Sequence, residues 1–112
     1  MKTVVFDHFD EKMIADMVHD RFIDVESIFW EKSRQYLEVS YFKDDDIKDV
    51  GGKISFEHVI DVKLVDTEMI RYYDLNFINW NESEHKIELV TNIPLTFEIT
   101  STEFEMTVAV FD

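Results

Sequence analysis

The chain shows a repeated alternation of apolar and polar residues, which is typical of β-strands with one buried face. The alternation is most regular over residues 53–65, where Ile54 and Phe56 share one parity and Lys53 and Glu57 share the other. We therefore predict one half-buried strand there. Similar alternation predicts five further strands, over residues 37–41, 73–80, 87–91, 95–100 and 104–110.

Polar segments between the predicted strands indicate two hairpins. Residues 81–85 (Asn-Glu-Ser-Glu-His) lie between two of the strands, and the Ser-Thr pair at 101–102 lies between the last two. Polar turn residues between two alternating runs join neighbouring antiparallel strands. We therefore predict a hairpin at each of these segments.

The segment before residue 32 combines two patterns. One set of apolar residues recurs at the spacing of a single helix face: Ile14, Val18, Phe22, Val25 and Phe29. Over residues 22–30, however, β-branched and aromatic residues dominate, which favours a strand. We predict a helix over 10–18, with Asp10 at its positive end, followed by a strand over about 21–31.

These elements predict a mainly β fold in a single domain, residues 1–112. Six or seven antiparallel strands would form a meander closed as a barrel or a sandwich, with one short N-terminal helix. The pattern does not distinguish a barrel from a sandwich. The predicted core lies on the dominant apolar parities: Val39, Phe56, Ile60, Leu64, Phe97 and Val108.

The composition describes an acidic folded protein. Hydrophobic residues make up 46% of the 112 residues and aromatic residues 14%, which excludes a disordered acidic tail. The 25 acidic residues outnumber the 11 basic ones, and the net charge of -14 disfavours nonspecific binding to nucleic acid or to anionic membranes. No apolar stretch suits a secretory signal or a membrane span, so we expect a cytoplasmic protein.

The sequence lacks the common patterns of catalytic and metal sites. The absence of cysteine excludes disulfides, thiolate metal sites and a thiol nucleophile, and no glycine-rich phosphate loop is present. His8 and Asp10 have the spacing of two ligands in an iron site, but such short matches are common in an acidic chain. The acidic run at 44–46 lacks the ligand pattern of a calcium loop. We predict no catalytic residues, no metal and no cofactor.

Two groups of residues are candidates for binding a partner. No Lys or Arg follows Lys86, so the predicted C-terminal hairpin carries an uncompensated acidic face with Glu98, Glu103 and Glu105. This face serves either solubility or the capture of a basic protein. The second group is aromatic and lies on the opposite parity of the strands: Tyr36, Phe42 and Tyr72.

His58 suggests a different function. It occupies the apolar parity of the strand predicted over 53–65, between Phe56 and Ile60. A histidine there is either a partly buried residue with a hydrogen-bond partner or a pocket residue. In the second case, a small β-barrel would hold an apolar small molecule in its interior.

Three segments between residues 19 and 60 carry a family resemblance: HDRFIDVESIFW at 19–30, YLEV at 36–39 and ISFEHV at 54–59. They resemble immunity proteins of bacterial polymorphic toxin systems and their uncharacterised relatives. The resemblance implies a cytoplasmic, non-enzymatic protein that binds a cognate toxin, and it transfers no binding residue. A protein-binding module is therefore our first hypothesis, the ligand-binding barrel is the alternative, and an enzyme using His8 and Asp10 is third. The oligomeric state is left open.

Overall fold

A computed structural model describes residues 1–43 and 49–111 of the chain. This part of the chain contains one antiparallel sheet of ten strands, one α-helix and two short 3-10 helices. In chain order the elements are β1 (Lys2–Phe6), α1 (Glu11–Val18), β2 (Arg21–Asp24), η1 (Val25–Ser27), β3 (Phe29–Glu31), η2 (Lys32–Arg34), β4 (Tyr36–Phe42), β5 (Gly52–Phe56), β6 (Val59–Val65), β7 (Tyr72–Asn81), β8 (Lys86–Thr91), β9 (Thr96–Ser101) and β10 (Met106–Val110).

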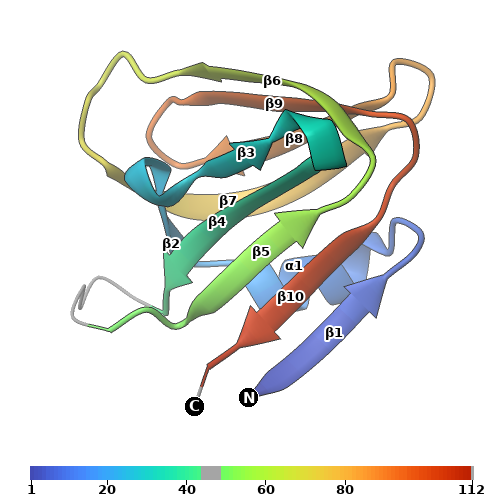
Figure 1. Ribbon diagram of the computed structural model, residues 1–112. Coiled ribbons are helices and arrows are strands. Elements are labelled where there is room, and N and C mark those ends of the chain that lie inside the picture. The colour runs from blue at the N-terminus through green and yellow to red at the C-terminus, as the bar shows by residue number, and fades with distance from the viewer. Residues whose placement is uncertain (44–48, 112) are drawn as a thin grey trace.

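The sheet is open and curves around the core. Its strand order is β1-β10-β5-β4-β2-β7-β8-β9-β6, so β1 and β6 are the end strands, and the short β3 also pairs with β4. In Figure 1, β6 and β9 lie at the top, β5, β10 and β1 cross the lower front, and α1 lies behind β5 and β10. The predicted mainly β, antiparallel fold with one N-terminal helix is confirmed. The predicted closure is wrong, and so is the count of six or seven strands.

The additional strands arise where turns divide the predicted ones. Residues 53–65 form two strands, β5 and β6, because the chain turns at His58, where φ is 61°. Residues 21–31 form β2 and β3, because η1 interrupts them; the Asp24 carboxylate accepts a hydrogen bond from the N–H of Glu26 (3.0 Å). β1 was not predicted, since only three consecutive apolar residues mark it, and its pairing with β10 stabilises it.

The C-terminal hairpin predicted at residues 101–102 is also wrong. β9 pairs with β8 and β6, whereas β10 pairs with β5 and β1. Ser101 is fully buried at the end of β9, and its Oγ lies 3.2 Å and 3.0 Å from the carbonyl oxygens of Glu57 and His58 in the β5–β6 turn. This contact joins the end of β9 to the β5–β6 turn, and it gives the buried hydroxyl hydrogen-bond acceptors. The hairpin predicted at residues 81–85 is present as β7 and β8.

The core fills the concave side of the sheet with aromatic and branched side chains. Of the predicted core residues, Val39, Phe56, Phe97 and Val108 are buried. Ile60 and Leu64 are 42% and 38% exposed, contrary to the prediction, because β6 is an end strand with a β-bulge near its start.

The predicted helix is confirmed as α1, which packs against β7. Asp10 caps its N-terminus by accepting a hydrogen bond from the N–H of Met13 (3.1 Å), and Ile14 and Val18 are buried against the sheet. No helix in the described ranges is long and apolar enough to cross a membrane. The acidic run at 44–46 lies outside the described residues.

The first prediction concerns the core. Replacing Phe56 or Phe97 with Ala should lower the free energy of unfolding by about 3–5 kcal/mol, because each substitution leaves a cavity at a fully buried position. The matched control is Phe29→Ala on β3, where the side chain is 48% exposed and the expected loss is below about 1 kcal/mol. Urea unfolding followed by circular dichroism measures all three variants, and equal losses would contradict the assignment of the core.

Candidate functional site

Three connections of the chain meet at one end of the sheet and line an open cavity of about 540 Å³. They are the β1–α1 loop, the β7–β8 turn and the β9–β10 connection, which lie on the right in Figure 1. We call this cavity the aromatic pocket. Its lining residues are Asp7, His8, Phe9, Trp80, Glu82, His85, Thr102, Glu103 and Phe104.

The floor of the aromatic pocket is a cluster of three rings. Phe104 is buried, and Phe9 meets it edge-on with ring centroids 5.5 Å apart. Trp80 lies tilted against Phe104 at 5.7 Å and meets the ring of His85 edge-on at 6.1 Å. Because each aromatic ring contacts another in a favoured edge or tilted geometry, the floor is held in place before any ligand arrives.

The rim of the aromatic pocket is acidic. Asp7, Glu82 and Glu103 contribute three carboxylates, and no Lys or Arg is among the lining residues. His8 Nδ1 lies 2.8 Å from Asp7 Oδ1, and this hydrogen bond lowers the pKa of Asp7. Carboxylates around an aromatic floor suit a cation, since ring faces and carboxylates both attract positive charge.

The β7–β8 turn has a defined geometry that positions Glu82 and His85. The Asn81 carboxamide oxygen accepts hydrogen bonds from the Ser83 hydroxyl (2.9 Å) and from the N–H of Glu84 (3.1 Å). An asparagine that bonds to the backbone two or three residues onward stabilises a tight turn. His85 ends the turn with a φ of 55°, and β8 begins at the next residue.

The sequence pattern had placed His58 on the inner face of a strand. In the structure it lies instead beside the aromatic pocket. It is in the β5–β6 turn, and its side chain is 34% exposed. Its Nε2 is 3.2 Å from a carboxylate oxygen of Glu103 and 3.2 Å from one of Glu105. His58 therefore holds two of the predicted acidic residues together, and Glu103 is shared between this cluster and the pocket.

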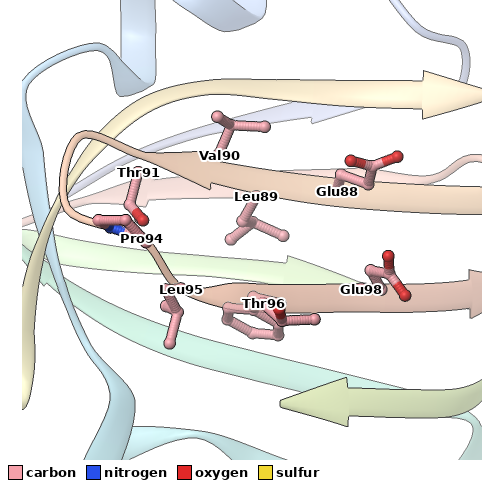
Figure 2. Close-up of a pocket in the computed structure, with 9 residues that line it drawn as sticks. Glu88, Leu89, Val90, Thr91, Pro94, Leu95, Thr96 and Glu98 are labelled. Carbon is pink, nitrogen blue, oxygen red and sulfur yellow. The ribbon is translucent and has the colours of Figure 1, made fainter. Parts of the chain in front are cut away.

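Glu98, the third predicted acidic residue, lies on the outer side of β9, away from that cluster. It is directly opposite Glu88 on β8, and two carboxylates facing each other across a strand pair repel. The β8–β9 pairing ends at these residues, and beyond them the strands separate around a second cavity of about 320 Å³. Figure 2 shows Glu88 and Glu98 on one side of this cavity and Pro94 with Leu95 on the other.

The three aromatic residues predicted to form one binding face do not lie together. Phe42 is buried and meets Tyr72 edge-on at 5.6 Å. Tyr36 is at the opposite end of β4, roughly 20 Å from Phe42 at the rise of a β-strand. The guanidinium carbon of Arg34 lies 5.4 Å from the ring centroid of Tyr36, and that of Arg71 lies 4.9 Å from the ring centroid of Tyr72. Each of the two tyrosine rings is therefore covered by a different arginine.

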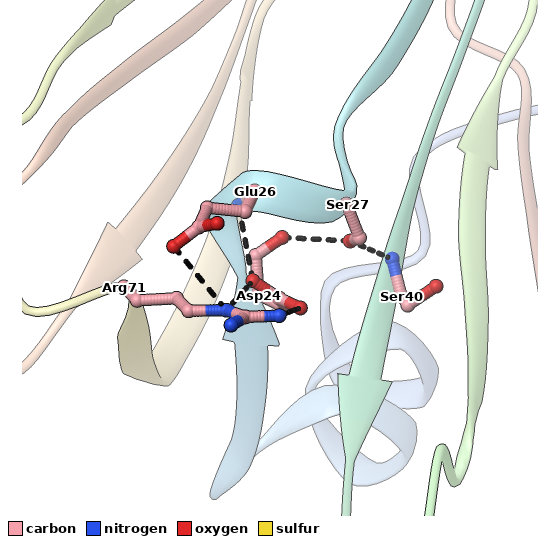
Figure 3. A network of polar contacts seen from close by, with 5 residues as sticks. All are labelled: Asp24, Glu26, Ser27, Ser40 and Arg71. Carbon is pink, nitrogen blue, oxygen red and sulfur yellow. Dashed lines mark hydrogen bonds and ion pairs between the residues drawn. The ribbon is translucent and has the colours of Figure 1, made fainter.

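Arg71 also holds the polar network around Asp24, which is buried. Its Nε and Nη2 donate to the two carboxylate oxygens of Asp24 at 3.0 Å and 3.1 Å, and this pairing raises the pKa of Arg71. Figure 3 shows the network continuing through Ser27, which donates to the Asp24 carbonyl (2.7 Å) and accepts from the N–H of Ser40 (2.8 Å). The network joins η1, β4 and the start of β7, which is a structural role.

His8 and Asp10 do not form the iron-type pair that their spacing allowed. His8 contacts Asp7, and Asp10 caps α1. Within residues 1–43 and 49–111, no three His, Asp or Glu side chains are grouped closely enough to hold a metal ion.

The three residues that form the pocket floor were not among the binding residues predicted from the sequence. Trp80 directly precedes the polar turn at 81–85, and Phe104 follows the polar segment 101–103. Phe9 precedes the Asp10 helix cap. An aromatic residue beside each of three turns was the available signal, but the sequence does not show that the three turns meet.

No family model, curated protein or solved structure matches this chain. The resemblance of residues 19–60 to immunity proteins therefore stays a prediction, and the function has to be argued from the geometry of the site.

The second prediction tests the role of Arg71. Arg71→Ala should lower the thermal midpoint of unfolding by more than about 5 °C, because it leaves the buried Asp24 carboxylate without its cation. The control is Arg34→Ala, since Arg34 likewise covers a tyrosine and pairs with Glu31, but on the surface. Thermal unfolding followed by circular dichroism measures both variants, and equal midpoints would show that the Asp24 network does not stabilise the fold.

Proposed function

We propose that this protein is a non-enzymatic binding module that captures a basic protein, with the aromatic pocket receiving a cationic side chain of that partner. The observation that carries the proposal is the combination of an aromatic floor with a rim of three carboxylates and no lysine or arginine among the lining residues. A cognate toxin, the partner that the resemblance implies, is one protein of this class.

The chemistry of the pocket favours arginine as the captured residue. A guanidinium group is planar, so it stacks on an aromatic ring while its N–H groups donate to carboxylates at the edge. Trp80 is the ring type that attracts cations most strongly, and Glu82 lies two residues from it on the same turn. A cavity of about 540 Å³ has room for such a side chain.

The charge of the whole chain supports fast encounter with a basic partner. A net charge of -14 attracts a positively charged protein over long distances and repels nucleic acid. Glu105, held beside Glu103 by His58, extends the acidic rim beyond the pocket. Of the predicted binding residues, the proposal therefore retains Glu103 and Glu105 as the docking surface.

The interior of the sheet favours this proposal over the ligand-binding barrel. Large side chains fill the interior, where Tyr41, Tyr73 and Phe56 are fully buried. His58, on which the barrel hypothesis depended, points to carboxylates near the surface.

The third prediction tests arginine recognition with short model peptides. A peptide with one central Arg should bind and change the tryptophan fluorescence of a Trp30→Phe variant, in which Trp80 is the remaining tryptophan, whereas the same peptide with neutral citrulline should bind much more weakly. Glu82→Gln and Glu103→Gln should each weaken binding by about 3- to 10-fold, because each removes one carboxylate from the rim.

Glu84→Gln is the matched control for these variants, since Glu84 is in the same turn as Glu82 but does not line the pocket. Its affinity for the peptide should equal that of the wild type. An equal loss in the Glu84 variant, or equal binding of the arginine and citrulline peptides, would contradict recognition by the aromatic pocket.

The fourth prediction concerns the rate of association with a basic protein probe such as cytochrome c. The double variant Glu103→Lys, Glu105→Lys should slow association, and the difference should shrink as salt shortens the screening length from about 10 Å at 0.1 M to about 3 Å at 1 M. The control is Asp49→Lys with Glu68→Lys, which changes the net charge equally at two exposed residues outside the pocket. Stopped-flow kinetics should show a larger effect for the first pair, and equal effects would indicate that the acidity serves only solubility.

A further inference from the structure

β6 is an end strand of the sheet and has one unpaired edge. One edge of β6 pairs with β9, and among the described residues no strand pairs with the other edge. Five of its side chains are exposed: Ile60, Asp61, Lys63, Leu64 and Val65. An exposed strand edge presents unpaired backbone N–H and C=O groups, which makes it a template for pairing with another strand.

The sequence of β6 is complementary to itself in the antiparallel direction. If two copies of β6 pair about Val62, then Val62 lies opposite Val62, and Asp61 of each copy lies opposite Lys63 of the other. The register places two opposite-charge pairs symmetrically on either side of an apolar centre. Opposite charges and apolar pairs in facing positions each stabilise an antiparallel ladder.

The apolar and the charged side chains of β6 lie on opposite faces of the strand, as this register requires. Val62 and Leu64 are paired with Ile99 and Phe97 of β9, whose side chains are buried, so they continue the apolar face of the sheet. Asp61 and Lys63 alternate with Val62 and are therefore on the opposite, polar face. The N–H of Val59 already donates to the carbonyl of Gln35 (2.9 Å), and Ile60 lies in the β-bulge between Val59 and Asp61, so the free regular ladder begins at Asp61.

We propose that the partner of β6 is β6 of a second copy of this chain, which gives a two-fold symmetric dimer with one continuous sheet. Two chains of net charge -14 repel each other, so association requires local charge pairs, and β6 supplies two of them. The other end strand does not offer this match: pairing of β1 about Val4 would place Thr3 opposite Val5 and Lys2 opposite Phe6. The proposal does not depend on the aromatic pocket, which β6 does not line.

Sedimentation equilibrium of the full chain over a range of concentrations tests the proposal. The wild type should form dimers, and Asp61→Lys or Lys63→Asp should each weaken dimerisation by about tenfold or more, because each turns two attractive pairs into two repulsive ones. The exchange of both residues, Asp61→Lys with Lys63→Asp, should restore the dimer, since it reverses each pair and keeps the net charge.

Mixing the two single variants gives the sharpest result. Each variant repels itself, but the Asp61→Lys chain is complementary to the Lys63→Asp chain along the same register. An equimolar mixture should therefore form heterodimers at concentrations where each variant alone is monomeric. Circular dichroism melting of every variant checks that the fold is retained.

Three results would overturn the proposal. One is a wild-type chain that stays monomeric up to about 1 mM, where any contact would be negligible. Another is dimerisation that the single substitutions leave unchanged, which would place the interface elsewhere. The third is a mixture of the two variants that associates no more than each variant alone. None of these results bears on arginine binding by the aromatic pocket, so the two proposals fail separately.

Discussion

The polar contacts of Ser101 and Thr102 join the two places where the chain crosses the sheet. β5 leads into β6 and β9 leads into β10, so both connections pass between the strand group β1-β10-β5-β4 and the group β7-β8-β9-β6. Ser101 Oγ contacts the carbonyls of Glu57 and His58, which are 44 and 43 residues away along the chain, and the N–H of Thr102 donates to the carbonyl of His58 (3.0 Å). These bonds define where the sheet bends onto itself.

The position of this crossing determines the chemistry of the nearby surface. Glu103 and Phe104 come two and three residues after Ser101, so the crossing places a carboxylate beside His58 and an aromatic ring beside Phe9 and Trp80. The three residues that follow β9, Thr102, Glu103 and Phe104, thus serve the fold and the rim and floor of the aromatic pocket. A rigid support of this kind is what a binding site requires, because side chains that are already ordered lose little entropy when a ligand binds.

The aromatic pocket and the end strand β6 differ in electrostatic character. The aromatic pocket contains carboxylates and no lysine or arginine, so it is suited to a positively charged partner. β6 instead carries one acid and one base with a single valine between them, so it is suited to a strand of its own sequence. A high net negative charge is compatible with both, because it opposes nonspecific contact and leaves only locally matched pairs favourable.

Local patterns determined the elements, and long-range contacts decided how they are combined. Alternation of apolar residues correctly predicted β4, β7, β8 and β9, and the spacing of Ile14 and Val18 correctly predicted α1, because these signals depend only on neighbouring residues. The positive φ of His58, the Ser101 crossing and the meeting of Phe9, Trp80 and Phe104 depend on residues far apart in sequence. A half-buried strand has the same pattern whichever strand it pairs with. The β7–β8 hairpin could be predicted from its turn, but the partners of β9 and β10, the open edge at β6 and the pocket were decided by the tertiary structure alone.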